Sequence, residues 1–325
     1  MEKSRMKKFR SQIMDTQQNN IELKTLVKDI LDYGDLLIIS NKGYGKTNSL
    51  MVLAEEFMKL PHCRTIIFET FPKWINEFSM IPYAYINDDM VIQWDNAIYY
   101  EQPSENYGWF SKDRSYYLRN SEEIGKILDS NKNLLFCLEI EDYTRLSWFV
   151  TLMVYQFYRT NYLTAYKYGI QKIKYHVVFI IEESQNVLDR TVVDKKIFNK
   201  LRKMFSEARN LKLHFVMATQ RCQDINTRIR GRSRFLIGKV NLDDYDLKIR
   251  RLLRNSKYRK QVLTLPKGSF IYPSKDVIVK FPKFKQHGKP YELPIEPLPN
   301  YYVEEQPKPS LVQRIINKIG DIIHD

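Results

Sequence analysis

Short apolar runs alternate along this chain with longer segments whose apolar residues recur every three or four positions. Runs of about four to eight apolar residues have the length of buried strands, and the longer spacing is typical of helices with one apolar face. The expected strands are 36–39, 64–71, 134–140, 177–181, 212–220 and 234–240, followed by a hairpin of 268–272 and 277–281. The expected helices are 21–33, 48–60, 142–168, 192–211 and several within 242–263. This alternation predicts an α/β fold with a doubly wound, mostly parallel sheet.

The alternating pattern covers residues 34–285 and so divides the chain into three parts. Residues 1–33 form a basic N-terminal arm and a helix, and the arm is either solvated or in contact with phosphates. Residues 286–325 combine a proline-rich linker with an amphipathic tail helix, since seven prolines fall within 282–309 and apolar residues then recur at helical spacing. An isolated helix of this length is marginal in water, so residues 310–325 are expected to dock on a partner.

One stretch, at about 72–130, interrupts the alternation as an insertion whose first fifty residues are rich in tyrosine and tryptophan. Two interpretations are open. The aromatic side chains could stack on nucleic acid bases, or they could form the interior of an irregular inserted subdomain. We favour the second interpretation, because clustered aromatic residues more often pack on one another.

A glycine-containing loop follows the first expected strand and precedes a helix. Residues 40–47 read S-N-K-G-Y-G-K-T, which matches a phosphate-binding loop except that Ser40 replaces its first glycine. Gly43 and Gly45 allow successive backbone N–H groups to turn around phosphate oxygens. Lys46 has the length to reach the β- and γ-phosphates, and the Thr47 hydroxyl can bind Mg²⁺. The expected ATP-binding residues are Ser40, Asn41, Lys42, Gly43, Tyr44, Gly45, Lys46, Thr47 and Asn48.

Two further strands end in polar residues. Glu182 and Glu183 follow the apolar run 177–181, and Gln220 ends the strand 212–220. Carboxyl ends of parallel strands meet at one edge of a sheet, so these residues should lie beside the loop. ATP hydrolysis needs these groups: Glu182 as a second Mg²⁺ ligand, Glu183 to orient or deprotonate water, and Gln220 to sense the γ-phosphate.

The net charge of the chain indicates which class of partner it binds. The chain has 52 lysines and arginines against 38 acidic residues, a net charge of +14. Such a balance favours a polyanionic partner, nucleic acid first and an acidic membrane second. The stretch after Gln220 concentrates this charge in Arg221, Arg228, Arg230, Arg232 and Arg234. Phosphate contacts of this kind are indifferent to base sequence, although each arginine could equally form a solvated or inter-subunit contact.

Cysteine and histidine usage narrows the chemistry. Cys63, Cys137 and Cys222 are far apart, and the five histidines form no metal-binding motif. We therefore expect a reducing compartment, with neither disulfides nor a transition metal. The N-terminus lacks the apolar core of a signal peptide, and no run of 18 apolar residues exists. A cytoplasmic protein without a transmembrane segment is the resulting expectation.

Over residues 30–285, the order and spacing of these motifs resemble the FtsK–HerA superfamily of ring-forming ATPases that pump DNA. The most telling stretch is S-E-A-R-N-L-K-L-H-F-V-M-A-T-Q-R, at 206–221. The resemblance implies a RecA-like sheet with the glutamine strand between the loop strand and the acid-ended strand. It also implies that Arg209, eleven residues before Gln220, contacts the ATP of the neighbouring subunit. Two residues depart from the family pattern: Ser40 replaces glycine, and Glu182 stands where aspartate is usual.

These inferences predict an ATP-driven translocase of double-stranded DNA that acts as a ring, with a hexamer as the expected assembly. A viral or plasmid packaging or transfer motor fits the chain's size, and residues 310–325 would then dock on a capsid or membrane-associated protein. Catalysis is assigned to Lys46, Glu183, Arg209 and Gln220, and the Mg²⁺ contacts to Thr47 and Glu182. Two alternatives stay open: a morphogenesis or secretion ATPase that moves protein or nucleoprotein, and an assembly ring that binds nucleotide without hydrolysing it.

Overall fold

The computed structural model of the chain describes residues 23–70, 74, 83–87, 92–95, 133–188, 195–241 and 247–285. The expectations for the basic arm, the tail helix and most of the insertion concern residues outside these ranges. Within these ranges, no helix has both the length and the apolar character needed to cross a bilayer.

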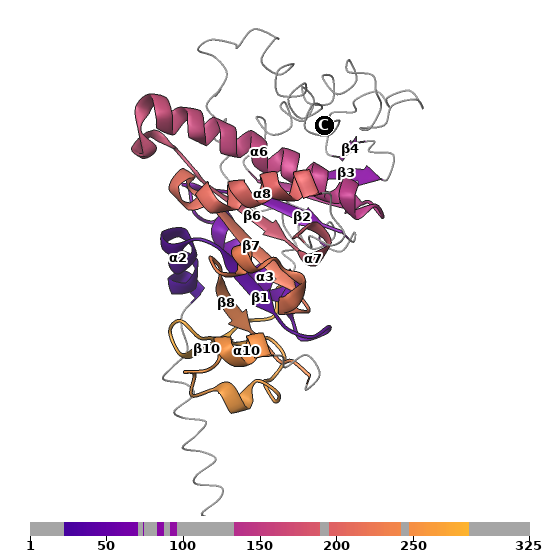
Figure 1. The fold of residues 1–325 in the computed structure, drawn as a ribbon, viewed down its shortest axis with the longest axis vertical. Coiled ribbons are helices and arrows are strands. Elements are labelled where there is room, and N and C mark those ends of the chain that lie inside the picture. The colour runs from indigo at the N-terminus through magenta and orange to yellow at the C-terminus, as the bar shows by residue number, and fades with distance from the viewer. Residues whose placement is uncertain are drawn as a thin grey trace, which may run out of the picture.

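A ten-stranded sheet runs through the middle of the molecule (Figure 1), in the order β10-β9-β8-β1-β7-β6-β2-β5-β3-β4. Strands β1, β2, β3, β5, β6, β7 and β8 are parallel, whereas β4 and β9 pair antiparallel with their neighbours. The strands are β1 (Leu36–Ile39), β2 (Cys63–Glu69), β3 (Tyr83–Asn87), β4 (Ile92–Asp95), β5 (Leu134–Glu139), β6 (His176–Ile181), β7 (Leu213–Thr219), β8 (Arg234–Ile237), β9 (Ser269–Tyr272) and β10 (Val277–Lys280).

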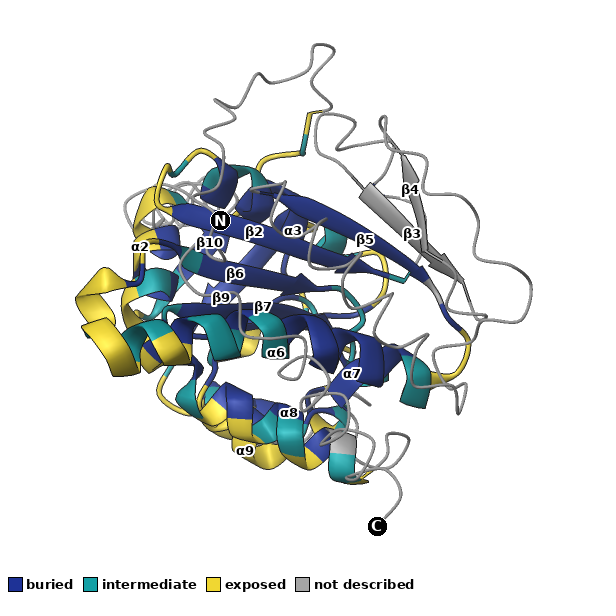
Figure 2. Ribbon diagram, turned by 90° about the horizontal axis from the view of Figure 1, so that it is seen from above, coloured by how far each residue is buried: buried dark blue, intermediate teal, exposed yellow. Residues whose placement is uncertain are grey.

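Helices cover both faces of this sheet. One face carries α2 (Leu23–Tyr33) and α3 (Lys46–Met58). The opposite face carries α6 (Tyr143–Tyr168), α7 (Gln185–Leu188), α8 (Lys195–Glu207) and α9 (Thr227–Arg230), which lie along one side of the strands in Figure 2. The remaining helical segments are α10 (Leu247–Leu252) and the 3₁₀ turns η1 (Ile170–Lys172), η2 (Ala208–Leu211), η3 (Cys222–Asp224) and η4 (Arg259–Gln261).

The central strand β1 shows how the core is divided. Leu37 and Ile39 belong to the apolar cluster on the side of α6 and α8, whereas Leu36 and Ile38 belong to the cluster on the side of α2 and α3. All four side chains are fully buried. A strand that is apolar on both faces is what a parallel sheet covered by two helix layers requires.

The predicted α/β class and its mostly parallel sheet are confirmed, and β7 does lie between β1 and β6. The expected terminal hairpin also forms, with β9 and β10 paired antiparallel.

The prediction of an irregular insertion was wrong where the structure describes it. Strands β3 and β4 extend the main sheet, because β3 pairs with β5. Trp74 is fully buried in the main core, on the side of α2 and α3, and so is not part of a separate aromatic subdomain. The alternation in Y-A-Y-I-N at β3 was the available signal for a strand.

The prediction of several helices within 242–263 was also wrong in part, because less of the described stretch is helical than expected. Within 247–263, only α10 and η4 are helical. The chain between them turns against Asp276, whose carboxylate accepts hydrogen bonds from the Ser256 hydroxyl at 2.8 Å and from the Lys257 N–H at 3.2 Å. A side chain about twenty residues away thus shapes the local structure, and a helical pattern alone does not contain that information.

Parallel strands give the sheet two chemically different edges. We call the edge where β1, β6 and β7 end the carboxyl edge, at residues 40, 182 and 220. The edge where these strands begin, at residues 35, 175 and 212, is the amino edge.

Candidate functional site

The loop between β1 and α3 has the turn geometry that its glycines predicted. Gly43 and Gly45 have φ of 84° and 96°, in the left-handed region that favours glycine. Gly45 directly precedes α3 as its N-cap. A Cβ on Gly45 would lie 3.2 Å from the backbone nitrogen of Gly268, whose N–H donates to the Tyr44 carbonyl. The loop therefore needs glycine at 45 both for its conformation and for its contact with the β9 turn.

Lys46 folds back over the loop. Its ammonium group donates to the carbonyl oxygens of Ser40 at 2.7 Å and Asn41 at 3.1 Å. The residue is only 8% exposed, and burial lowers the pKa of its ammonium while the carboxylates of Glu183 and Glu182 oppose that shift. The lysine is thus held in the concave side of the loop beside both predicted acids.

Ser40 occupies its position without backbone strain. It is fully buried, and its φ is not among the positive values found for non-glycine residues in the part of the chain that the structure describes. Space for its side chain comes from Gly238, just after β8, where an added Cβ would lie 2.8 Å from the Ser40 Cβ. Gly238, just after the neighbouring strand, therefore leaves room for the side chain that Ser40 has in place of the loop glycine.

Glu182 is held from two sides. The Thr47 hydroxyl donates a hydrogen bond to its Oε1, and the indole N–H of Trp74 donates to its Oε2 at 2.7 Å. The Trp74 backbone N–H in turn donates to the buried carboxylate of Glu69 at 2.7 Å. Sequence reasoning missed Trp74, because nothing in its local sequence separates it from the many aromatic residues around it.

Glu183 and Gln220 also come together, as predicted. The Gln220 amide lies 3.4 and 3.5 Å from the two oxygens of the Glu183 carboxylate, and the Gln185 amide donates to it as well. Glu183 has a φ of 51°, an uncommon value for this residue type. The backbone thus turns at Glu183, two residues after β6 ends, and several contacts hold the side chain there.

Other predicted loop residues have structural contacts of their own. The Tyr44 hydroxyl accepts a hydrogen bond from the Lys239 ammonium at 2.9 Å, and the Asn41 N–H donates to the Lys239 carbonyl. Asn48 binds the chain after β10, since its amide donates to the Pro282 carbonyl and its Oδ1 accepts from the Phe284 N–H, both at 2.8 Å. Lys42 is exposed on the loop, and a Cβ on Gly43 would have no atom within 4 Å.

Arg209 does not join this group. It lies in η2 at the amino edge, is exposed, and its Cδ is 3.9 Å from where a Cβ on Gly34 would be. The seven residues of β7 separate it from Gln220, and at about 3.3 Å per residue they span roughly 23 Å. Arg209 is therefore far outside the reach of the loop in its own chain.

The site offers oxygen ligands rather than nitrogen or sulfur ligands. Thr47 and Glu182 contact one another directly, so both would face one cation. Hydroxyl and carboxylate oxygens are the ligands that Mg²⁺ accepts, with water and phosphate oxygens completing its shell. Among the residues that the structure describes, no group of three or more His, Cys, Asp or Glu side chains is arranged to hold a metal. This donor set fits Mg²⁺ that arrives with a phosphate ligand.

A strand, glycine loop and helix beside an acid-ended strand, with one strand between them, define a RecA-like P-loop ATPase fold.

No protein-family model and no curated protein matches the sequence. Solved structures do match. The bacterial conjugative coupling protein TrwBΔN70 gives a TM-score of 0.51 at 10% identity, covering 85% of this chain and 94% of that one. ATPases 2 and 3 of EssC from Geobacillus thermodenitrificans give 0.51 at 12% identity, covering 89% and 45%.

The genome packaging NTPase B204 from Sulfolobus turreted icosahedral virus 2, in complex with sulfate, gives a TM-score of 0.46 at 14% identity, covering 76% of this chain and 95% of that one. The likeness to TrwB and EssC extends over most of this chain, so the predicted resemblance is confirmed for the fold. At such low identities the likeness concerns the fold alone, and function has to be argued from the site.

Proposed function

We propose that this chain is an ATP-driven translocase of double-stranded DNA that acts as a ring and packages or transfers a viral or plasmid genome. One observation carries the proposal. The phosphate loop, Glu182, Glu183 and Gln220 meet at the carboxyl edge, although they come from three separate strands. These are the groups that ATP hydrolysis requires.

Substrate binding is assigned to the loop. The Lys46 ammonium now binds the carbonyls of Ser40 and Asn41, and it would exchange them for the β- and γ-phosphate oxygens of ATP. Thr47 and Glu182 would hold Mg²⁺, which neutralises charge on the phosphates when bound. Trp74 keeps the second oxygen of Glu182 hydrogen-bonded, so the carboxylate of this longer acid is held in one orientation.

Water activation is assigned to Glu183. Its carboxylate lies beside Lys46 and accepts from the Gln220 amide. A carboxylate in this position can orient a water molecule toward the γ-phosphate and accept its proton. Gln220 would respond to the γ-phosphate and relay its presence to Glu183 through their contact.

Completion of the site is assigned to a second copy of the chain. Arg209 cannot reach its own loop because β7 lies between them. A guanidinium on the γ-phosphate stabilises charge in the transition state. In a ring, the amino edge of each subunit would face the carboxyl edge of the neighbouring subunit and would supply Arg209 to the ATP bound there. We propose that the ring is a hexamer.

Double-stranded DNA is proposed as the cargo because of the net charge of +14. The arginines after Gln220 differ in exposure. Arg230 and Arg234 are half-buried: the first donates to the Cys222 carbonyl at 3.0 Å, and the second lies over the Tyr33 ring at 4.4 Å. The phosphate contacts are assigned to the exposed members, which are Arg221, Arg228 and Arg232. Residues 310–325 are proposed to dock this motor on a capsid or membrane-associated protein.

The test is an ATPase assay with and without duplex DNA of several sequences. We expect turnover that duplex DNA stimulates without sequence preference, and stimulation that fades as salt rises because counterions compete for the phosphates. Lys46→Ala should lose nucleotide binding and turnover together. Turnover that ignores DNA would favour a motor with a protein cargo, and nucleotide binding without turnover would favour an assembly ring.

A further inference from the structure

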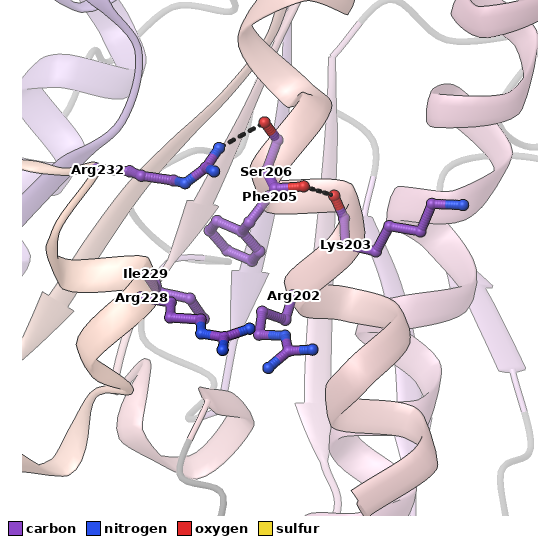
Figure 3. Close-up of a pocket in the computed structure, with 7 residues that line it drawn as sticks. All are labelled: Arg202, Lys203, Phe205, Ser206, Arg228, Ile229 and Arg232. Carbon is purple, nitrogen blue, oxygen red and sulfur yellow. Dashed lines mark hydrogen bonds between the residues drawn. The ribbon is translucent and has the colours of Figure 1, made fainter.

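A basic pocket lies between α8 and α9, on the face of the sheet opposite α3 (Figure 3). Its volume is about 270 Å³. It is separate from the phosphate loop, since Ser206 in its wall is only three residues before Arg209, near the amino edge. Four cationic side chains contribute to it: Arg202, Lys203, Arg228 and Arg232.

The floor of the pocket is apolar and firmly packed. Phe205 and Ile229 line it and are 4% and 1% exposed. The Phe205 ring stacks on Phe215 of β7 with the ring centroids 3.7 Å apart. Both floor residues belong to the core cluster on this face of the sheet. The floor therefore has a fixed shape on which a ligand could rest.

The rim of the pocket concentrates positive charge. The Arg232 guanidinium donates to the Ser206 carbonyl at 2.6 Å, which anchors it on the last turn of α8. Arg202 and Arg228 line the same pocket, and in Figure 3 their side chains extend toward one another. The charge of Arg232 acts on the buried Asp35, but among the described residues no carboxylate forms an ion pair with any of the four cations.

Some cations elsewhere in the described residues do have a partner. Lys59 pairs with Glu55 and Glu56 on α3, and Lys200, on the same helix as Arg202, lies over the Tyr155 ring at 4.1 Å. Adjacent guanidinium groups repel one another unless an anion lies between them. The α8–α9 pocket is therefore built for an anionic ligand.

We propose that the α8–α9 pocket binds a phosphate group of a nucleic acid backbone, with the sugar resting on the apolar floor. Guanidinium groups match phosphate oxygens in a two-pronged geometry that lysine cannot reproduce. The pocket is smaller than the roughly 300–1,000 Å³ typical of sites for whole drug-sized ligands, so it suits one sugar–phosphate unit. In naming duplex DNA as the source of the phosphate, the inference rests on the proposed function.

The test uses full-length chain and a fluorescently labelled duplex of about 30 bp, with binding followed by anisotropy at several salt concentrations. The double variant Arg202→Gln, Arg228→Gln removes both adjacent charges and keeps side chains of similar character. We expect affinity near 100 mM salt to fall about tenfold or more, and the slope of log K against log salt to become shallower by about one for each phosphate that the variant no longer neutralises. Lys260→Gln, an exposed cation on η4 outside the pocket, should leave both quantities unchanged.

A second variant tests whether a loss of DNA affinity comes from misfolding or from the loss of the guanidinium groups. Arg228→Lys keeps the charge and removes the two-pronged geometry, so its affinity should fall between those of the wild type and the double variant. Thermal unfolding should be unchanged in all three variants, since none of the side chains that they alter belongs to the packed floor.

Equal affinity and equal salt slopes in the double variant would overturn the proposal. So would a calorimetric signal showing that inorganic phosphate or AMP occupies the pocket while duplex DNA does not compete for it. These outcomes are distinct from failure of the proposed function, which would appear in the wild type as ATPase that is absent or indifferent to DNA.

Discussion

The polar side chains at the two edges of the sheet differ in whether they contact the candidate site. At the carboxyl edge, Lys46, Thr47, Glu182 and Gln220 are all hydrogen-bonded to other members of the site or to the loop. At the amino edge, Arg209 is exposed and lies about the length of a strand away from them. The carboxyl edge thus gathers most of the groups of a catalytic site, whereas the cation that we assign to the transition state is on the other edge.

Beneath Arg209, the amino edge is polar but weakly charged. His176 and His214 contact each other at 2.9 Å, and burial lowers their pKa values to about 4 and about 3. Asp35 accepts a hydrogen bond from the Phe215 N–H at 3.0 Å, and burial raises its pKa to about 7. These groups hold strands together in neutral or partly neutral form. Arg209 differs from these buried groups because it is exposed, which is compatible with the contact to a neighbouring subunit that we propose for it.

The largest expected effect comes from removing that arginine. Arg209→Ala should bind ATP as the wild type does and hydrolyse it about 10³-fold more slowly, because the transition state loses a guanidinium. Single-turnover hydrolysis and fluorescent nucleotide binding measure the two quantities. Arg254→Ala, another exposed arginine, is the matched control and should be active.

Mixing two inactive proteins tests whether the carboxyl edge of one subunit and the amino edge of another form one active site. Arg209→Ala and Lys46→Ala subunits should regain part of the activity when they assemble together, because some interfaces then combine an intact loop with an intact arginine. Turnover of the mixture against that of each protein alone measures the effect. A strictly monomeric species with full ATPase activity would contradict the assignment to a neighbouring subunit.

A smaller loss is expected on the carboxyl edge from Glu183→Gln. The amide keeps the size of the side chain but cannot accept a proton, so turnover should fall about 10²-fold while ATP remains bound. Glu141→Gln, at an exposed position before α6, provides the control. Unchanged turnover in Glu183→Gln would remove this residue from the catalytic group.

Trp74 offers a milder way to disturb the same edge. Trp74→Phe keeps an aromatic ring in the core but removes the N–H that donates to Glu182. Partners of metal ligands typically contribute about 10- to 100-fold to metal affinity, so the Mg²⁺ concentration that supports nucleotide binding should rise by about tenfold. Trp148→Phe changes a buried indole on α6 instead and should have no such effect. Equal Mg²⁺ dependence in both variants would mean that Trp74 serves packing only.

The last prediction concerns stability rather than activity, at the amino edge. The carboxyl group of Asp35 has a pKa of about 7 in the folded chain, against 3.8 without burial. The folded state therefore binds more protons than the unfolded state between about pH 4 and 7, and the stabilising contribution is lost as pH rises through this window, by at most about 4 kcal/mol. In Asp35→Asn, the unfolding free energy relative to wild type should increase from about pH 4.5 to about 7.5 in denaturant titrations. A difference that is constant with pH would show that Asp35 does not titrate there.

Sequence patterns predicted the carboxyl edge well for a physical reason. Its residues sit at strand ends, and parallel strands bring their carboxyl ends together, so Glu182 and Gln220 could be placed without coordinates. Trp74 could not be placed in this way, because its role depends on a contact across 108 positions of sequence. The α8–α9 pocket was equally hidden, since two cations of α8 and two from the α9 region meet only through packing.

Gly238 has a consequence for how this loop could have changed over time. Its absent Cβ leaves room for the side chains of Ser40 and Phe270, each 2.8 Å from where that atom would be. Residues in such contact do not contribute independently to stability. The side chain of Ser40 and a side chain at 238 would therefore compete for the same space, so the two positions are coupled: a larger residue just after β8 would favour glycine at 40. A search pattern that demands glycine at the loop's first position overlooks chains of this kind, whereas a pattern that scores the two positions jointly would find them.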